Sequence, residues 1–183
     1  TFFEDARIPA DCLMGAEGEG WKVAMRALEY ERGARPGAAG GYTIRQTDPL
    51  EIVGRAKRAV RNGKPALDDP IMRDKLVAKI IDGQGMMANN ERAKISALCT
   101  ERPLALPLAS KLTFTEYARE VGELALELEG AQAGYYVGEN SSRANGYWQR
   151  SYLNACSATI GGGTSQIQRN IVGEHVLGLA KSK

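Results

Sequence analysis

Histidine and cysteine are scarce in this sequence, and their scarcity narrows the possible chemistry. His175 is the only histidine, and the three cysteines, Cys12, Cys99 and Cys156, are far apart and form no CxxC pair. We therefore expect no metal site and no disulfide framework, and a reducing, cytoplasmic location is the default expectation. A Ser/His or Cys/His catalytic group would depend on His175 alone, and a histidine on a helix face is the simpler interpretation.

Charge of one sign and long apolar runs are also missing. The 183 residues include 24 Lys+Arg and 22 Asp+Glu, which gives a net charge of +2. Nucleic acids and anionic membranes attract clusters of positive charge, so we expect neither as a partner. No apolar run approaches the roughly 18 residues that a membrane span needs. With 43% hydrophobic and 25% charged residues, the chain has the composition and length of one globular domain with a sizeable core.

The beginning of the sequence differs from the rest. Thr1-Phe2-Phe3 is typical of the end of a strand, and a loop follows through Pro9 and Gly15. The sequence offers no second strand to pair with it, and an unpaired strand exposes backbone groups. We therefore predict that this segment belongs to a larger protein or pairs with another chain.

The remaining sequence has helical periodicity. It predicts helices that begin near Glu19, Pro49, Pro70, Pro107, Tyr147 and Ser165. The second is expected to end near Arg61, the third before Pro103 and the fourth at Gly130. Asp69 is the expected cap before Pro70, and Ser165 is the expected cap of the last helix. Several long helices without alternating strands indicate an all-α fold, an antiparallel four-helix bundle with a short extended N-terminal segment.

Apolar residues at helical spacing are expected to face the core of this bundle. They form four stripes: Trp21, Ala24 and Leu28; Met72, Leu76, Ile80 and Met87; Phe114, Ala118, Val121, Ala125 and Leu128; Ile167, Ile171, Val176 and Leu179.

One acidic residue interrupts the first of these stripes. Glu31 is in phase with Ala24 and Leu28, so its carboxylate would face the interior of the bundle. The alternative is an i, i+4 ion pair with Arg35 on a solvated face, which is the simpler interpretation of the residues alone.

A second feature is the run Ile160-Gly161-Gly162-Gly163-Thr164-Ser165, three glycines followed by a capping pair. Backbone amides at a helix N-terminus can donate hydrogen bonds to a phosphate or to a developing oxyanion. Glycine-rich turns more often serve only to allow positive φ or close packing, and this alternative stays open.

Three blocks of the sequence are more distinctive than these patterns. They read Phe2-Phe3-Glu4-Asp5-Ala6-Arg7-Ile8-Pro9-Ala10-Asp11, Gly18-Glu19-Gly20-Trp21-Lys22-Val23-Ala24-Met25 and Gly163-Thr164-Ser165-Gln166-Ile167-Gln168-Arg169-Asn170-Ile171. In order and separation they resemble the C-terminal portion of the acyl-CoA dehydrogenase family. The resemblance implies that residues 1–15 are the remnant of the family's central β-domain and its linker, and that residues 16–183 form the family's C-terminal helical bundle.

The resemblance also implies a reaction. Family members are flavoproteins in which a carboxylate takes the α-proton of an acyl-CoA thioester and the β-hydride passes to FAD, a step of fatty-acid β-oxidation in lipid metabolism. In many members the base stands at the position matched here by Gly162, which has no side chain. In a second branch the base comes from the first helix of the bundle, just before an arginine, and Glu31-Arg32 matches that position. We therefore expect Glu31 to be the base, with the Gly162 amide donating to the thioester carbonyl.

The same alignment gives the other site residues. Glu29 and Arg32 would lie near the CoA moiety and Leu28 near the acyl chain. Gly161 stands where many relatives carry tyrosine, which implies a wider acyl pocket for branched or ring-bearing chains. Thr164 and Gln166 match family positions that contact FAD.

Other FAD positions depart from the family pattern. The family has an Arg-x-Gln-Phe-Gly segment whose arginine reaches the flavin pyrophosphate of a neighbouring subunit; here it reads Ala59-Val60-Arg61-Asn62-Gly63. The family's Gln-x-x-Gly-Gly segment is replaced near Glu127-Leu128-Glu129-Gly130-Ala131. A homotetramer of this chain is therefore expected to bind FAD poorly, because charge-assisted hydrogen bonds contribute about 1.5 to 3 kcal/mol each.

These resemblances lead to one hypothesis and two alternatives. The chain would be part of an FAD-dependent acyl-CoA dehydrogenase, an oligomer with a paralogous subunit that resembles the assemblies of actinobacterial steroid side-chain degradation. Its electrons would pass to electron-transfer flavoprotein or a similar acceptor. The first alternative is a non-catalytic helical partner subunit of a heteromeric acyl-CoA dehydrogenase, and the second is an acyl-CoA oxidase.

Overall fold

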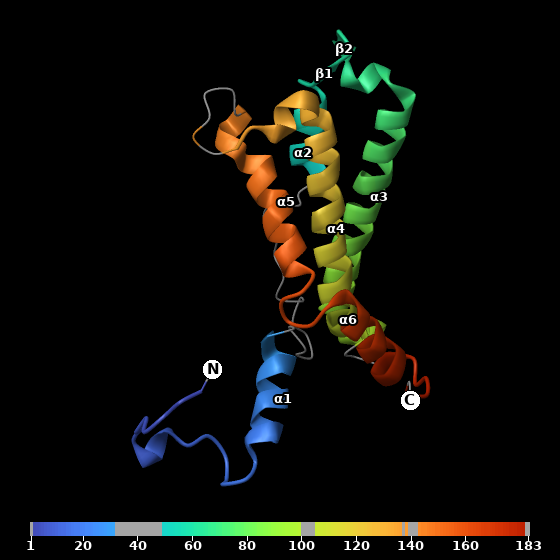
Figure 1. Ribbon diagram of the computed structural model, residues 1–183. Helices are drawn as coiled ribbons and strands as arrows, with labels where there is room; N and C mark the ends of the chain where they lie inside the picture. Colours follow the sequence, from blue (N-terminus) through green and yellow to red (C-terminus); the bar gives the residue numbers. More distant parts are fainter. Residues whose placement is uncertain (1, 32–48, 100–104, 137, 139–142, 182–183) are drawn as a thin grey trace.

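A computed structural model of the chain describes residues 2–31, 49–99, 105–136, 138 and 143–181 (Figure 1). Its α-helices are α1 (Gly20–Glu31), α2 (Pro49–Ala56), α3 (Pro70–Ala93), α4 (Ala105–Glu129), α5 (Tyr147–Ala158) and α6 (Ser165–Ile171). Two short strands, β1 (Val60–Arg61) and β2 (Lys64–Pro65), form a hairpin. Short 3-10 turns are η1 (Ala10–Cys12), η3 (Ala66–Asp68), η4 (Ser96–Leu98), η5 (Gly130–Gly134) and η6 (Arg143–Gly146), and η7 (Val172–Val176) is a π-helical turn.

Helix α4 forms the centre of the domain. Figure 1 shows α3, α4 and α5 running in alternating directions, with α4 between the other two, and α2 beside the upper half of α4. The mostly helical, antiparallel architecture predicted from the sequence is therefore confirmed. The core lies where α2, α3, α4 and α5 meet, and its buried side chains are Ile52, Ala56, Ala59, Ala66, Met72, Leu76, Tyr117, Val121, Leu124, Ala125, Leu128 and Trp148.

The long helices begin as their sequences predict, and most of their predicted core residues are buried; Met87 on α3 is an exception at 55% exposed. The Asp69 carboxylate accepts hydrogen bonds from the amides of Ile71 and Met72 at the start of α3. On α4 the whole predicted apolar stripe from Phe114 to Leu128 is buried. Gly122 lets α5 approach closely, since a Cβ there would lie 3.0 Å from Tyr152 Cα.

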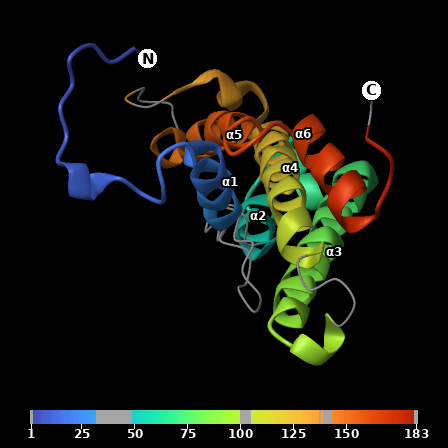
Figure 2. The ribbon, with the colours of Figure 1, turned by 90° about the horizontal axis from the view of Figure 1, so that it is seen from below.

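The N-terminal part stands apart from this core. Figures 1 and 2 together show α1 beyond the end of the α3–α5 bundle, and the preceding segment extends away from it. Trp21 is 77% exposed and Ala24 is also exposed, so the prediction that these two residues face the core was wrong, whereas Leu28 of the same stripe is half-buried. In this chain the apolar face of α1 is left for something other than α2–α6 to cover.

The hairpin was missed by the sequence analysis, which expected helix as far as Arg61. Helix α2 ends at Ala56, and β1 pairs with β2 through Val60–Pro65 and Arg61–Lys64. Asn62 and Gly63 form the two-residue turn with φ of 51° and 74°, the left-handed conformation that this dipeptide favours.

Among the described residues, no helix combines the length and the hydropathy required to cross a membrane.

Candidate functional site

The predicted glycine run forms the turn between α5 and α6. Gly162 and Gly163 have φ of +67° and +104°, a conformation that residues with a Cβ rarely adopt. Gly161 is different, because its φ is not positive and a Cβ there would have only Ser157 O within 4 Å, at 3.7 Å. The local backbone thus requires glycine at Gly162 and Gly163 but not at Gly161.

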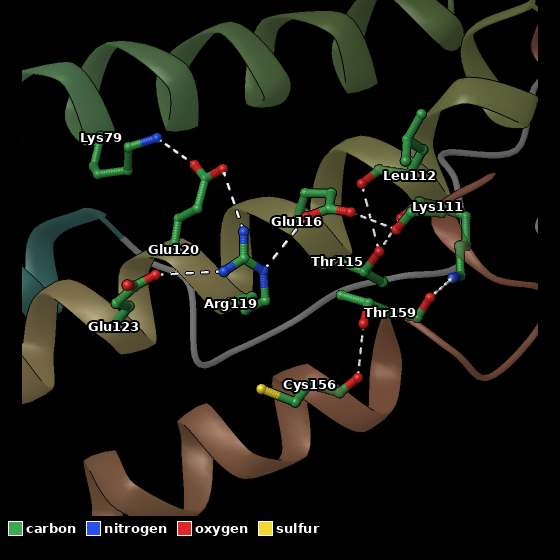
Figure 3. Close-up of polar contacts among 11 residues, drawn as sticks. Lys79, Lys111, Leu112, Thr115, Glu116, Arg119, Glu120, Glu123, Cys156 and Thr159 are labelled. Carbon is green, nitrogen blue, oxygen red and sulfur yellow. Dashed lines mark hydrogen bonds and ion pairs between the residues drawn. The ribbon is translucent and has the colours of Figure 1, made fainter. Parts of the chain in front are cut away.

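A buried lysine on α4 reaches this turn. The Lys111 side chain is fully buried, and its Nζ donates to Gly163 O at 2.7 Å and to Thr159 O at 3.4 Å. Figure 3 shows the side chain extending from α4 to Thr159, which follows the last residue of α5. An ammonium at this end of a helix also complements the partial negative charge of the terminal carbonyls.

The start of α6 is held by three further side chains. The Thr164 hydroxyl caps the helix by accepting from Ile167 N at 3.4 Å, so the cap lies one residue before the predicted Ser165. The Ser165 hydroxyl instead donates to a Glu116 carboxylate oxygen on α4. Fully buried Gln168 donates through Nε2 to Gly162 O at 2.8 Å.

The buried face of α6 is therefore polar, whereas the sequence analysis expected an apolar stripe. Ser165 and Gln168 are buried, while Ile167 is 48% and Leu179 is 61% exposed. Hydrogen bonds to α4 and to the turn thus take the place of hydrophobic packing on this helix.

Glu116 links the turn to an ion-pair network on α4. The Ser165 hydroxyl that donates to it is the largest influence and, with Arg119 and Arg169, holds the pKa of the Glu116 carboxyl below its ordinary value, although burial acts in the opposite direction. Arg119 lies between Glu116, Glu120 and Glu123, and Glu120 in turn accepts from Lys79 on α3 (Figure 3). Ion pairs thus connect Glu116, which contacts the start of α6, with Lys79 on α3 through Arg119 and Glu120.

The predicted cofactor and turn residues lie close together along the chain and in space. Gly161, Gly162 and Thr164 form the turn and the helix cap, and Gln166 is an exposed residue in the first turn of α6. Their proposed contacts with substrate and FAD stay predictions.

The residues predicted on α1 are described only in part. Leu28 is half-buried and Glu31 is the last residue of α1, while the side chains of Glu29 and Glu31 and all of Arg32 and Arg35 lie outside the described residues. Figure 1 shows the C-terminal end of α1 directed toward the α5–α6 turn. Glu31 is the last residue of this helix, and the position of its carboxylate relative to the turn stays a prediction.

The second group of predicted FAD positions lies at the opposite end of the bundle. Ala59 is buried next to the hairpin and its carbonyl accepts from Ala66 N at 2.9 Å. Glu127 binds Lys75 Nζ at 2.8 Å and lies 3.5 Å from Arg61 Nη1. Glu129 is buried, with its Oε1 at 2.6 Å from Arg55 Nε. The substituted residues are therefore engaged within this chain's own packing.

Lys111 and Gln168 are the residues that the sequence analysis missed. Gln168 stands in the quoted third block, but its spacing from Ser165 was not used to identify a second buried face. Lys111 gives no signal in the sequence, because a lysine on a helix is ordinarily solvated.

Within the described part of the chain no three His, Cys, Asp or Glu side chains are grouped as metal ligands, the cysteines are free, and His175 is exposed in η7.

The chain is similar to known proteins over nearly its whole length. The sequence pattern of the family described as acyl-CoA dehydrogenase, C-terminal domain, matches residues 18–177. Acyl-CoA dehydrogenase IpdE1 of Mycolicibacterium smegmatis is 38% identical over 182 residues, which cover 99% of this chain and 42% of that protein. IpdE1 of Mycobacterium tuberculosis is 35% identical over 99% of this chain and 44% of its own length.

A solved structure is similar over the same range. The ChsE4–ChsE5 complex from Mycobacterium tuberculosis has a chain with a TM-score of 0.75 and 26% identity, covering 99% of this chain and 46% of that one. This chain therefore spans less than half the length of the relatives that it matches. Its matched residues, its helical architecture and these similarities identify the chain as a member of the acyl-CoA dehydrogenase family that carries the family's C-terminal domain.

Proposed function

We propose that this chain forms the C-terminal part of an FAD-dependent acyl-CoA dehydrogenase, with Glu31 as the base that takes the α-proton of the acyl-CoA thioester. Residues 1–15 would then close the central β-domain of the protein and residues 16–183 would form its helical domain. One observation carries the proposal: the fold does not require glycine at Gly161, where the backbone is ordinary and a Cβ would meet only Ser157 O, at 3.7 Å. The space beside the turn is therefore available to a group from outside α5 and α6.

The proton transfer needs a carboxylate beside this space. The C-terminal end of α1 is directed toward the turn, which supports Glu31 as its source (Figure 1). An acyl chain lying over Leu28 and Gly161 would exclude water from the carboxylate and strengthen it as a base. The Gly162 amide would donate to the thioester carbonyl as negative charge develops on its oxygen. Glu29 and Arg32 would contact the CoA moiety.

The residues at the start of α6 fit a flavin. Thr164 and Gln166 offer a hydroxyl and an amide on the first turn of the helix, and Gln166 is exposed. Bound there, FAD would supply the acceptor for the β-hydride, and electron-transfer flavoprotein or a similar protein would reoxidise it. Holding the substrate, fixing the carbonyl and taking the proton are the tasks of this chain.

The residues at the hairpin end do not fit the distal part of a flavin. Ala59 is buried and offers no positive charge, and Glu127 and Glu129 are carboxylates that already pair with Lys75 and Arg55. The cations Lys75 and Arg55 are thus matched with carboxylates of this chain instead of with a pyrophosphate. We therefore propose that a paralogous subunit supplies the missing arginine, and the similarity to a chain of the ChsE4–ChsE5 complex supports a heteromeric assembly.

The same hairpin geometry favours a second candidate, a non-catalytic partner subunit. In that case this chain would stabilise an active paralogue and Glu31 would have no chemical role. A substitution of Glu31 distinguishes the two candidates more clearly than a measurement of flavin content does.

The test uses the complete protein, purified with its partner subunit and FAD. The flavin absorbance is followed anaerobically after an acyl-CoA substrate is added. Glu31→Gln is expected to abolish bleaching while acyl-CoA still binds, and Glu123→Gln, an exposed change in the Arg119 network, is expected to bleach like the wild type. Bleaching at the wild-type rate in Glu31→Gln would reject Glu31 as the base and favour the partner-subunit role.

A further inference from the structure

The turn that presents Gly162 has no side chains of its own at its three glycines. Gly161, Gly162 and Gly163 have no side chains to pack, and glycine loses more backbone freedom on ordering than any other residue. Within the turn, Gly161 N donates to Ser157 O at 3.0 Å and Gly163 N to Ile160 O at 3.2 Å. Side chains from other elements therefore add the packing that the three glycines cannot provide.

Lys111 supplies that support from α4. Its ammonium bonds to Thr159 O, just after α5, and to Gly163 O, just before the Thr164 cap of α6. One side chain thus ties both ends of the glycine run. A buried ammonium is costly to desolvate, so the two carbonyl contacts are stabilising and the side chain has little freedom to leave them.

Gln168 holds the middle of the turn from the other side. Its Nε2 lies 2.8 Å from Gly162 O, which fixes the orientation of the peptide between Gly162 and Gly163. Lys111 and Gln168 are both fully buried, so neither hydrogen bond is exchanged readily for one to water. The carbonyls of Thr159, Gly162 and Gly163 are all engaged by these two side chains.

We infer that Lys111 and Gln168 are positioning residues that set the turn geometry required for α-proton abstraction. The inference rests on the proposed function, in which the Gly162 amide donates to the thioester carbonyl. Neither side chain touches the substrate in this role; each acts through the backbone of the turn. A displacement of about 1 Å at such a donor reduces the rate by up to about 100-fold.

The experiment compares Lys111→Met and Gln168→Met in the complete, FAD-loaded protein with its partner subunit. Both changes remove the donor and keep a side chain of similar length. Lys94→Met is the matched control, because Lys94 is half-exposed just after α3, where it pairs with Glu91 far from the glycine run in the sequence. Hydrogen exchange is measured on the peptide that covers residues 159–165, and the rate of flavin reduction is measured separately from the Kd of acyl-CoA.

We expect faster exchange in the 159–165 peptide of both variants, with α3 and α4 peptides unchanged. The flavin reduction rate should fall by about 10- to 100-fold while Kd changes less than about threefold. Wild-type exchange in the turn of both variants would overturn the inference, as would faster exchange throughout the domain with a parallel loss of binding and rate. If Lys111→Met does not fold, Gln168→Met decides the outcome alone.

The two proposals fail in different ways. Suppose that Glu31→Gln bleaches like the wild type but Lys111→Met speeds hydrogen exchange in the turn. Lys111 then does order the turn, but the proposed base is wrong, and the catalytic part of the inference is overturned. If Glu31→Gln is inactive and both methionine variants match Lys94→Met in exchange and rate, the proposed function stands and the positioning role is rejected.

Discussion

Arg55 on α2 and Glu129 at the end of α4 form a buried ion pair, with Arg55 Nε 2.6 Å from Glu129 Oε1. The two side chains are 11% and 2% exposed, so removing Arg55 would take the cationic partner of this ion pair away from a buried carboxylate. Arg55→Met should therefore lower the free energy of unfolding by about 3 to 5 kcal/mol. The measurement is urea unfolding of the variant beside the wild type.

The double variant Arg55→Met, Glu129→Leu provides the control for this pair. Replacing both charges by apolar groups of similar volume is often nearly neutral, so the double variant should recover most of the lost stability. Additive losses from the two single changes would show that the ion pair is not an energetic unit.

Gly161 and Gly162 are adjacent glycines of which only Gly162 has a positive φ, so alanine substitutions at the two positions can be compared directly. Gly161→Ala should leave the free energy of unfolding unchanged or raise it by about 0.4 to 1 kcal/mol, because the backbone there is ordinary and the space is open. Gly162→Ala should lower it by about 1 to 2 kcal/mol, because its φ is +67°. Equal effects of the two substitutions in thermal or urea unfolding would contradict the distinction made between these positions.

The open space at Gly161 also predicts substrate selectivity. Under the proposed function, Gly161→Tyr should reduce kcat/KM for branched or ring-bearing acyl-CoA substrates by at least about tenfold, a loss of roughly 1.4 kcal/mol of transition-state binding. Short straight-chain substrates should be affected much less. A uniform loss across both substrate classes would indicate a general disturbance of the turn instead of a narrower pocket.

The Ser165–Glu116 contact predicts a pH-dependent contribution to stability. Because the folded-state pKa of Glu116 lies below its ordinary value of 4.5, the contact stabilises the fold above that pH and loses its effect as pH falls through the lowered pKa. Ser165→Ala should therefore be less stable than the wild type near neutral pH, and this difference should shrink below pH 4.5. Urea unfolding at a series of pH values measures it.

Glu116→Gln is the control for this linkage, since it removes the titrating group. In that background Ser165→Ala should have a stability effect that no longer varies across the acid range. A Ser165→Ala effect that is constant with pH in the wild-type background would reject the assignment.

The sequence predicted those parts of the fold that depend on local and periodic signals. Asp69 before Pro70 identified the start of α3 because a cap and a proline act within one turn. The α4 stripe from Phe114 to Leu128 identified the core because one face repeats at helical spacing over several turns. Helix α5 also begins at Tyr147, as the sequence predicted.

The errors occurred where the local signal was weak or overridden. Asn62-Gly63 is a strong hairpin signal, but the flanking strands have two residues each, too few for alternation to be recognised. On α6, Ser165 and Gln168 are buried because they form hydrogen bonds with α4 and with the turn. The exposure of Trp21 depends on which surfaces surround α1, and periodicity carries no information on that.

Within the candidate site, the sequence identified the glycine turn but not what supports it. Three adjacent glycines are visible in any reading of the chain. Lys111 lies 48 residues before Thr159 and 52 before Gly163, so its role exists only once α4 and α5 are packed together.

The central claim is that the Glu31 carboxylate takes the α-proton. The most direct measurement is incorporation of deuterium at the α-carbon of a bound acyl-CoA in D2O, catalysed by the complete protein with its partner and FAD and followed by mass spectrometry. We predict that Glu31→Gln loses this exchange while its acyl-CoA Kd stays within a few-fold of the wild type. Exchange at the wild-type rate in Glu31→Gln would contradict the account.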